Sequence, residues 1–382
     1  MDTLGGSLLF HRQFSGNADY ELFVVTDNSS YESAGCDAIV LQLPAFVRRL
    51  MRTRFGLFVH DAIHLFRGLW VSPRLWRAAY RFQPDLVLTG AETSMADLAY
   101  RLARSLNRPL VGHFMDWPTY GMLAHQPIKA WASRQFIHRY RRCQLAFGIC
   151  PEMLTHLGPH PNAHVFYPFA PDNRDPLPPP PPGPLARERP YTLLFAGNLG
   201  EWYGQALLAL RDVIPPGSLL KLVIAGRHAD WDPELEERLV AEGTYIGFLK
   251  GQAYRDALSH SDALLVIMGF DAEARLIEST SFKSKIVDYL LAERPLIVWG
   301  PCYSTAVRHA RSEGFALVVD SSDPSHVLQA LEKLAHNPTL CQQLVDAGRQ
   351  FRQRCLDADV VLPAALTAKR QLLAAWDRQP AL

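Results

Sequence analysis

A run of prolines near the middle of the chain divides the sequence into two parts. Six of the eight residues in Leu177–Pro184 are prolines, and they lie within the segment 173–190. Proline lacks a backbone N–H and fixes φ, so this run can join neither a helix nor a β-ladder, and we expect an extended spacer. A proline-rich ligand for another protein is the alternative, but folded patterns on both sides favour the spacer. The chain is therefore predicted to fold as two bodies with a spacer between them.

Short apolar runs typical of buried strands alternate with helical patterns on both sides of the spacer. Before it, strands are expected at Glu21–Thr26, Ala38–Leu41, Pro84–Gly90, Arg108–Phe114 and Leu145–Cys150. After it, they are expected at Tyr191–Gly197, Leu219–Ala225, Tyr245–Phe248, Ala263–Met268 and Leu296–Trp299. The helical patterns include Met95–Leu106, Ile128–Cys143, Pro324–Arg354 and Leu362–Trp376. This alternation predicts a parallel α/β sheet in each part.

Composition narrows the class of protein. A length of 382 residues with 48% hydrophobic residues suits two domains, each with its own core. The net charge of +1 argues against a dedicated nucleic-acid binder. The six cysteines are scattered without zinc spacing, so we expect neither a metal site nor a disulfide framework, and a reducing cytoplasm is the simplest location. We also expect no signal peptide and no membrane-spanning segment.

The region Phe46–Phe82 combines arginines with large aromatic residues. It is predicted to be helical, and its only acidic residue is Asp61. The arginines are Arg48, Arg49, Arg52, Arg54, Arg67, Arg74, Arg77 and Arg81. One interpretation places the aromatics in the core behind a solvated arginine face. A second is a surface that docks on anionic lipid, through Arg48, Arg49, Arg52 and Arg54 in particular. A nucleic-acid groove is a third, which the nearly neutral total charge disfavours.

The segment Ser279–Gly300 is the most informative for function. Its apolar residues recur at helical spacing, and Pro295 then ends the helix before a short strand and a Gly-Pro turn. Thr280, Ser281 and Ser284 can cap the start of this helix. Free N–H groups, the helix dipole, Lys283 and Lys285 would together favour a bound anion such as a diphosphate. Asp288 lies one turn further along, where its carboxylate can accept hydrogen bonds from a ribose.

This segment resembles the donor-binding motif of GT-B glycosyltransferases of the family-four-like group (glycosyl transferases group 1). In that motif Ser-Phe-Pro-(Ser/Thr)-Lys-x-x-Glu-Tyr-Leu-Ala-x-Gly-(Lys/Arg)-Pro precedes a strand and a Gly-Pro turn. Tyr303–Val307 and Gly314–Asp320 are similar to the blocks that follow. The resemblance is good over Tyr191–Arg354 and loose over the N-terminal half. It implies an α/β fold of the GT-B type, in which two Rossmann-like domains with parallel sheets face each other across a cleft.

The resemblance also implies a division of the chain. Residues 1–172 would form an acceptor-side domain whose first strand is missing, because Gly5 and Gly6 come almost at once. Residues 173–190 would be the spacer, and residues 191–355 the nucleotide-sugar-binding domain. A last helix in 356–382 would cross back to the N-terminal domain.

Site residues follow from the matching positions. The resemblance implies that the donor is bound by Gly197, Asn198, Arg227, Phe248, Ser284, Lys285 and Asp288. Gly5, Gly6 and Glu92 would lie on the acceptor side, and His113, Asp116 and Glu273 would be catalytic, with Glu278 an alternative to Glu273. The carboxyl ends of parallel strands, where Glu92, His113 and Asp116 are expected, are where such sheets bind ligands. A lone histidine after a strand can equally be structural.

The chain departs from the family pattern at several of these positions. Lys283 stands where proline is usual, Asp288 where glutamate is usual and Glu293 where glycine is usual. Asn198 and Tyr203 occupy the places of an arginine and a lysine that clamp the diphosphate in much of the family. Lys285, Lys283 and Arg227 are expected to compensate for that missing pair.

The resemblance implies a metal-independent, retaining glycosyltransferase of the hexosyltransferase type that needs no cofactor. It would move sugar from a nucleoside-diphosphate sugar to a glycan or lipid-linked acceptor in surface polysaccharide or glycoconjugate biosynthesis. It would work in the cytoplasm, either free or peripheral on the inner face of the membrane, and without nucleic acid. The alternatives are a catalytically silent GT-B-like partner subunit and a nucleotide-sugar 2-epimerase.

Overall fold

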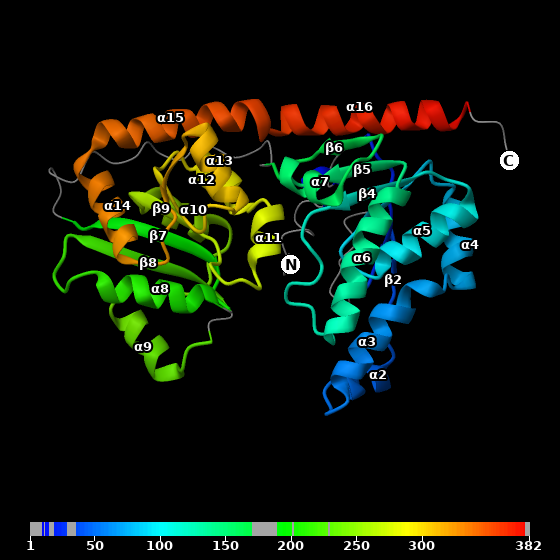
Figure 1. Cartoon of the computed structure of the whole chain (residues 1–382), viewed down its shortest axis with the longest axis horizontal. Helices are drawn as coiled ribbons and strands as arrows, with labels where there is room; N and C mark the ends of the chain where they lie inside the picture. Colours follow the sequence, from blue (N-terminus) through cyan, green and yellow to red (C-terminus); the bar gives the residue numbers. More distant parts are fainter. Residues whose placement is uncertain are drawn as a thin grey trace. The chain divides into compact units, whose positions relative to one another are not determined.

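The computed structural model describes residues 10, 12–14, 19–28, 36–169, 189–200, 202–227 and 230–378. The chain separates into two compact units (Figure 1). The first contains the described residues up to Phe169, the short segment Thr280–Phe282 and the described residues from Val361 onward. The second contains the described residues of 170–279 together with Lys283–Val360. Gly5, Gly6, the start of the chain for which a first strand is predicted to be missing, and most of the spacer lie outside the described residues.

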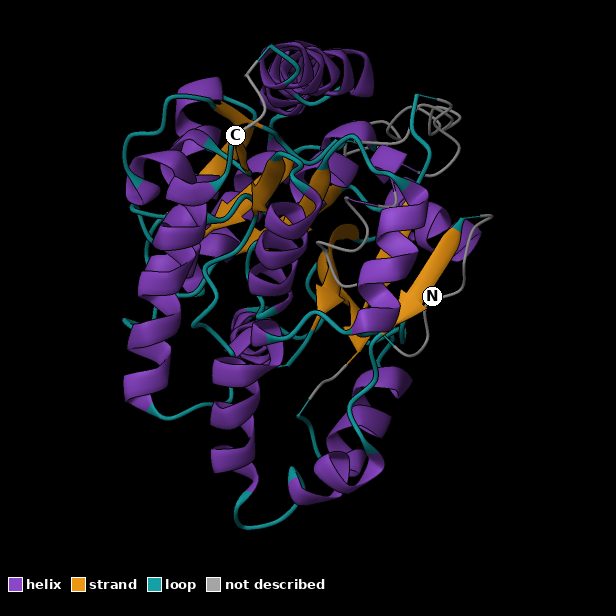
Figure 2. Ribbon diagram, turned by 90° about the vertical axis from the view of Figure 1, so that its right-hand side faces the viewer, coloured by secondary structure: helices purple, strands orange, loops and turns teal. Residues whose placement is uncertain are grey.

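The first unit is built on parallel strands. β3, β4, β5 and β6 form one sheet in that order, and β1 pairs with β2 in a separate two-stranded sheet. The elements are β1 (Phe23–Thr26), β2 (Asp37–Val40), α2 (Ala45–Leu50), α3 (Gly56–Phe66), the 3-10 turn η1 (Arg67–Leu69), α4 (Pro73–Phe82), β3 (Val87–Gly90), α5 (Met95–Leu106), β4 (Leu110–Phe114), α6 (Gln126–Arg142), β5 (Leu145–Gly148), α7 (Pro151–Leu157) and β6 (Ala163–Val165). The long helix α16 (Ala358–Trp376) belongs to this unit from Val361 on. Figure 2 shows helices on either side of the strands.

Local sequence explains how the helices of the first unit begin and end. Ser72 Oγ accepts a hydrogen bond from Leu75 N at 3.2 Å, and Pro73 occupies the first turn of α4, where its missing N–H costs nothing. Helices α4 and α5 end at Gln83 and Asn107, each with φ of 51°. Across the core, Arg139 of α6 donates to both carboxylate oxygens of Asp97 on α5, at 3.1 and 2.6 Å. These contacts hold the two helices against the edge of the sheet.

The second unit contains a five-stranded parallel sheet in the order β11-β10-β9-β7-β8. Its elements are β7 (Tyr191–Asn198), α8 (Trp202–Val213), β8 (Leu220–Arg227), α9 (Pro233–Ala241), α10 (Gly251–His260), β9 (Ala263–Ile267), α11 (Arg275–Thr280), α12 (Lys285–Leu291), β10 (Leu296–Trp299), α13 (Thr305–Glu313), β11 (Ala316–Val319), α14 (Ser325–His336) and α15 (Pro338–Cys355). Helices α8 and α14 share a buried cluster with one face of the sheet, while α12 and α13 lie nearer to α15 (Figure 1).

Helix α12 ends at a turn in which Glu293 stands where glycine is usual in the motif that this segment resembles. Glu293 has φ of 51°, a left-handed backbone conformation that side chains other than glycine seldom adopt. Its carboxylate accepts hydrogen bonds from Arg349 of α15 at 2.9 and 3.0 Å. These bonds hold the pKa of Glu293 below its usual value. The ion pair therefore fixes Glu293 at the turn between α12 and β10.

The α/β class and the parallel sheets predicted from the sequence are confirmed. The helical character predicted for Phe46–Phe82 is also confirmed, as three helices and a 3-10 turn. One local prediction is corrected. Tyr245–Phe248 is not a strand, because only Tyr245 forms an isolated bridge, to Ile224 at the edge of the sheet. No helix among the described residues combines the length and apolar composition needed to cross a bilayer.

Candidate functional site

The second unit has a topological switch point at the carboxyl end of β7. From β7 the chain passes to β8 on one side, and it returns later to place β9 on the other side. Open parallel sheets bind ligands at such a point, because the loops that leave the two strands diverge there. The last residues of β7 and β8 are paired, Gly197 with Gly226 and Asn198 with Arg227. The predicted donor residues Gly197, Asn198 and Arg227 therefore lie together at the carboxyl ends of β7 and β8.

Lys285, the first residue of α12, places its ammonium group over Gly197. A Cβ atom at Gly197 would overlap Nζ and Cε of Lys285, so this approach requires glycine. Nζ lies 4.1 Å from the centroid of the Phe195 ring and 5.6 Å from that of Tyr203. Burial, and second the charge of Lys283, lower the pKa of Lys285 to about 7. Within the described part of the chain, no carboxylate or carbonyl accepts a hydrogen bond from this ammonium.

Lys283 is differently placed from Lys285. Its Nζ lies 3.2 Å from Glu278 Oε2, and it donates to Tyr203 Oη at 3.4 Å. The side chain of Glu278 is 2% exposed, and its Oε1 accepts a hydrogen bond from Gly269 N at 3.1 Å, just beyond β9. The Glu278 carboxylate thus offsets the charge of Lys283 and holds it at the β9 side of the switch point. Sequence reasoning had grouped the two lysines, whereas the fold gives them different surroundings.

Helix α12 is short and is held firmly against β7. Tyr289 Oη accepts a hydrogen bond from Ala196 N at 2.9 Å and donates to Ala196 O at 3.3 Å, and burial raises the pKa of this phenol. Ser284 takes the N-cap position with helical backbone angles and makes no capping hydrogen bond, so the predicted capping by Ser284 is wrong. Its side chain and that of Asp288 are half-buried at the start of this helix.

Aromatic and cationic side chains also gather beyond β8. The Arg227 guanidinium lies 4.8 Å from the centroid of the Phe248 ring, and Lys250 Nζ lies 5.1 Å from the same ring. Phe248 is 47% exposed, and Asn198 at the end of β7 is exposed as well. An exposed ring flanked by two cations offers a planar apolar surface beside positive charge.

In the first unit, Glu92 and His113 lie at neighbouring strand ends, since Gly90 of β3 pairs with His113 of β4. Glu92 Oε1 accepts hydrogen bonds from the backbone N–H groups of Met115 and Asp116, at 2.8 and 3.4 Å. Burial raises the pKa of Glu92 to about 7. Asp116 itself is exposed.

His113 is only 1% exposed and lies among aromatic rings, with centroid distances of 5.2 Å to Phe10, 4.9 Å to Phe147 and 4.9 Å to Phe166. Burial, and second the charge of Lys369, lower its pKa well below the usual value, so the imidazole is neutral. Its Nε2 is buried and makes no hydrogen bond to any described residue. A buried nitrogen without a partner is costly, which makes it a candidate to meet a ligand.

Two further residues were missed or misplaced by sequence reasoning. Glu273 is exposed before α11, whereas Glu278 is buried beside Lys283, which favours Glu278 for a role near a donor. Lys369 of α16 is 2% exposed and lies over the rings of Phe14, Tyr20 and Phe147, and burial lowers its pKa to about 8. The one sequence signal that could have identified Lys369 is its position on the apolar side of the predicted helix. No group of three or more potential metal ligands gathers among the residues that the structure describes.

Comparison with solved structures identifies the fold. HepE from Anabaena, solved in complex with UDP, superposes with a TM-score of 0.66 at 12% identity, covering 96% of each chain. Sucrose-phosphate synthase from Thermosynechococcus elongatus gives a TM-score of 0.61 at 12% identity, covering 92% of this chain and 88% of that one. A glycosyltransferase from Rickettsia africae gives 0.60 at 11% identity, covering 92% and 90%.

The chain therefore has the GT-B glycosyltransferase fold, as its sequence predicts. No family model matches the sequence, and no match was found among curated proteins.

Proposed function

We propose that the protein is a glycosyltransferase that uses a nucleoside-diphosphate sugar as its donor. The observation that carries this proposal is the ammonium of Lys285, which lies over Gly197 at the switch point and meets no acceptor among the residues that the structure describes. Lys285 is half-buried, so its charge is partly desolvated with no described carboxylate beside it, and a bound diphosphate would supply the counter-charge. The complex of HepE with UDP supports this choice of ligand.

In this proposal Lys285 stabilises the leaving diphosphate. As the bond between the sugar carbon and the diphosphate oxygen breaks, negative charge builds up on the phosphate. A fixed cation in a poorly solvated site stabilises that charge strongly, the task that a divalent ion performs in other transferases. Lys283 and Glu278 would hold the β9 side of the site, and Asp288 would bind the ribose. Phe248 and the backbone beside it would lie against the base.

On the acceptor side, we propose that His113 and Asp116 orient the sugar or the acceptor hydroxyl, with Glu92 fixing the loop that carries Asp116. The acceptor oxygen would bond to the sugar carbon, and its proton would pass to the leaving phosphate. This front-face course gives retention and needs no covalent nucleophile. A hexose transferred to a glycan or lipid-linked acceptor in surface polysaccharide or glycoconjugate synthesis would fit it.

A catalytically silent partner subunit is the second candidate. The Glu278–Lys283 ion pair favours it, because one of the two lysines expected to replace the missing basic pair is already neutralised by the protein. Such a subunit would still bind a nucleotide but would not turn it over.

Thermal-shift measurements with UDP, GDP, ADP and CDP at pH 7 test the proposal. We expect one diphosphate to raise Tm by a few degrees, since ligand at ~100 times its Kd stabilises the fold by about 2.7 kcal/mol. The matching monophosphate should have much less effect, because it lacks the phosphate assigned to Lys285.

Equal effects of mono- and diphosphate, or no effect of any nucleotide, would contradict the proposed donor site. If one diphosphate does bind, release of the sugar from the corresponding nucleotide sugar distinguishes an active transferase from a silent subunit. An active transferase should slowly hydrolyse its donor, whereas a silent subunit should only bind it.

A further inference from the structure

Helices α2 and α3 and the residues after η1 carry large apolar side chains on the surface. We call this surface the basic aromatic face. Four of its aromatic residues are more than three-fifths exposed: Phe46 (65%), Phe58 (63%), Phe66 (62%) and Trp70 (74%). Its other apolar members are Leu50, Phe55, Leu57 and Leu69. The interpretation that these aromatics face the core is therefore wrong for this part of the chain.

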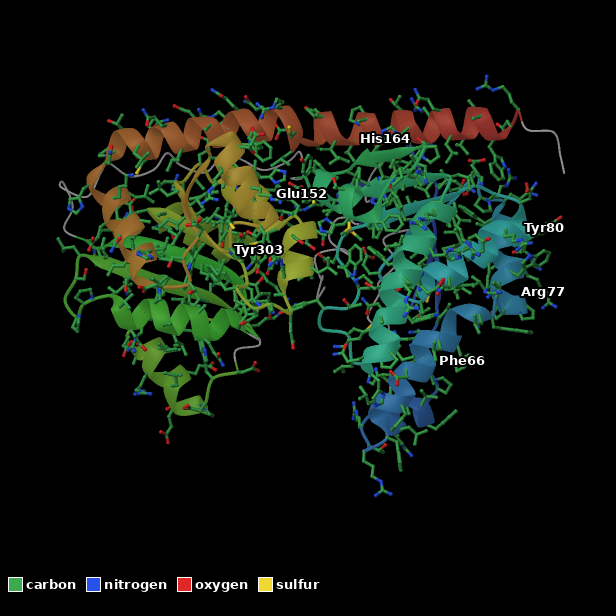
Figure 3. All side chains as sticks on the ribbon, viewed as in Figure 1. Phe66, Arg77, Tyr80, Glu152, His164 and Tyr303 are labelled. Atoms are coloured by element: carbon green, nitrogen blue, oxygen red, sulfur yellow. The ribbon has the colours of Figure 1, made fainter. Side chains whose placement is uncertain are left out.

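The two helices pack little of their surface into the unit. Helix α2 has no buried residue, and the only buried residue of α3 is Gly56. Gly56 makes the tight turn between them, because a Cβ there would overlap the carbonyl oxygen of Met51. Figure 1 shows α2 and α3 together at the lower end of the first unit, and Figure 3 labels Phe66 on α3. Apolar side chains on helices placed in this way favour contact with something other than water.

The charges on the face have one sign. Arg48, Arg49, Arg52 and Arg54 are exposed, and no ion pair joins any of them to a described carboxylate. The single acidic residue between Phe46 and Phe82 is Asp61, and its carboxylate already accepts bonds from the backbone and ring of His125. The Arg54 guanidinium lies 4.8 Å from the centroid of the Phe55 ring, so a cation and an apolar ring are presented side by side.

Helix α4 also carries arginines and aromatic rings on its exposed side. Trp76 and Tyr80 stack with ring centroids 5.0 Å apart, and Arg74, Arg77 and Arg81 are exposed. Figure 3 shows Arg77 and Tyr80 directed away from the body of the unit. The exposed side of α4 therefore resembles the basic aromatic face in composition.

We propose that the basic aromatic face docks the protein on an anionic phospholipid surface. Tryptophan and other amphipathic rings prefer the depth of the lipid headgroups, and arginine binds phosphate in a bidentate manner. Together, exposed apolar rings and unpaired arginines match an interface that is apolar inside and negative at its rim. A second copy of the chain fits less well, because a twofold contact would bring identical arginine clusters together. This inference does not depend on sugar transfer.

Vesicle sedimentation of the full chain tests this proposal. We expect the protein to bind vesicles of phosphatidylcholine with phosphatidylglycerol at about 0.1 M salt, and not vesicles of phosphatidylcholine alone. Replacing Arg48, Arg49 and Arg52 by alanine should weaken binding roughly 100-fold, because each cation near such a surface contributes several-fold. The pair Phe58→Ser and Trp70→Ser should also weaken binding, and that loss should persist at higher salt.

A matched control removes three exposed cations of the second unit, as Arg238→Ala, Arg308→Ala and Lys333→Ala. This variant has the same net charge as the arginine variant and should bind like the wild type. Equal binding by all variants, equal loss in the control, or a stable dimer that needs Phe58 and Trp70 would overturn the proposal. All the substituted side chains are exposed, so unchanged Tm verifies folding, and nucleotide binding should be unchanged in every variant.

Discussion

The two units each contain a lysine held over aromatic rings, and the two lysines differ in whether a described residue accepts a hydrogen bond from the ammonium group. Lys369 in the first unit lies over three rings and donates to Tyr20 Oη at 3.3 Å. Lys285 in the second unit lies over two rings and meets no acceptor among the residues that the structure describes. Burial lowers both pKa values, to about 8 and about 7. The protein thus provides a hydrogen-bond acceptor for Lys369, whereas we propose that a bound anion provides one for Lys285.

Replacing each lysine by methionine tests this difference most strongly. Lys285→Met keeps the length of the side chain but removes the charge that would stabilise the leaving diphosphate. We expect sugar transfer or donor hydrolysis to fall by about 100-fold or more, measured as kcat/KM. Lys369→Met should leave the Kd of the diphosphate within about twofold, because the lysine that binds it is untouched.

The stability of Lys285→Met provides the control. The folded pKa of Lys285 lies below its unfolded value of 10.5, so protonated Lys285 disfavours folding. That cost is complete below about pH 7 and disappears as the pH rises towards 10.5. At pH 7 the variant should therefore have a Tm equal to or above that of the wild type. A large fall in Tm would mean that Lys285 is structural, as we infer for Lys369.

A smaller effect is expected when the glycine under Lys285 is given a side chain. In Gly197→Ala the new Cβ would occupy the place of the ammonium, and the flexible lysine would move aside while the fold remains. Diphosphate binding should weaken by about tenfold, in line with the loss of one charge-assisted hydrogen bond. Isothermal titration of the best diphosphate measures this.

The double variant Gly197→Ala, Lys285→Met sharpens the result. If the glycine acts only by making room for the ammonium, the double variant should bind no more weakly than Lys285→Met alone. Additive losses would show that Gly197 contacts the nucleotide independently of Lys285.

The smallest expected effect is the uptake of protons when the diphosphate binds. A bound diphosphate should raise the pKa of Lys285 towards its ordinary value, so binding at pH 8 should take up about one proton, and uptake should vanish below about pH 6. Titrations at pH 8 in two buffers of different ionisation enthalpy measure it. Uptake should be lost in Lys285→Met and kept in Lys369→Met. Binding heats that do not depend on the buffer would contradict the assignment.

Much of the fold could be predicted because its signals are local. The helix expected at Met95–Leu106 has those bounds in the structure, and the apolar runs that became β7, β8, β9 and β10 were found within a few residues. Buried parallel strands are nearly continuous in apolar residues, so they are conspicuous in a sequence. Tyr245–Phe248 was wrongly predicted to be a strand because two aromatic rings in a short apolar run resemble one. In the structure Phe248 is exposed and lies beside Arg227, the last residue of β8.

The surroundings of individual side chains could not be predicted in the same way. Lys283 and Lys285 are two residues apart, yet one meets Glu278 and the other an aromatic surface. Glu278 is only five residues from Lys283, in α11. The rings beside Lys285 belong to Phe195 of β7 and Tyr203 of α8, which are far away in sequence. The exposure of Phe46, Phe58 and Trp70 likewise depends on whether another element covers α2 and α3, and no local pattern reports that.

By itself, the sequence determined the alternation of strands and helices, including the helix and the strand of the segment around Lys285, because apolar spacing and proline act over a few residues. Only the tertiary structure decided which lysine meets a carboxylate, which glutamate is buried beside a lysine, and that Lys369 lies against rings from two distant segments. Desolvation and charge pairing depend on every atom within a few ångströms, and the fold alone brings those atoms together.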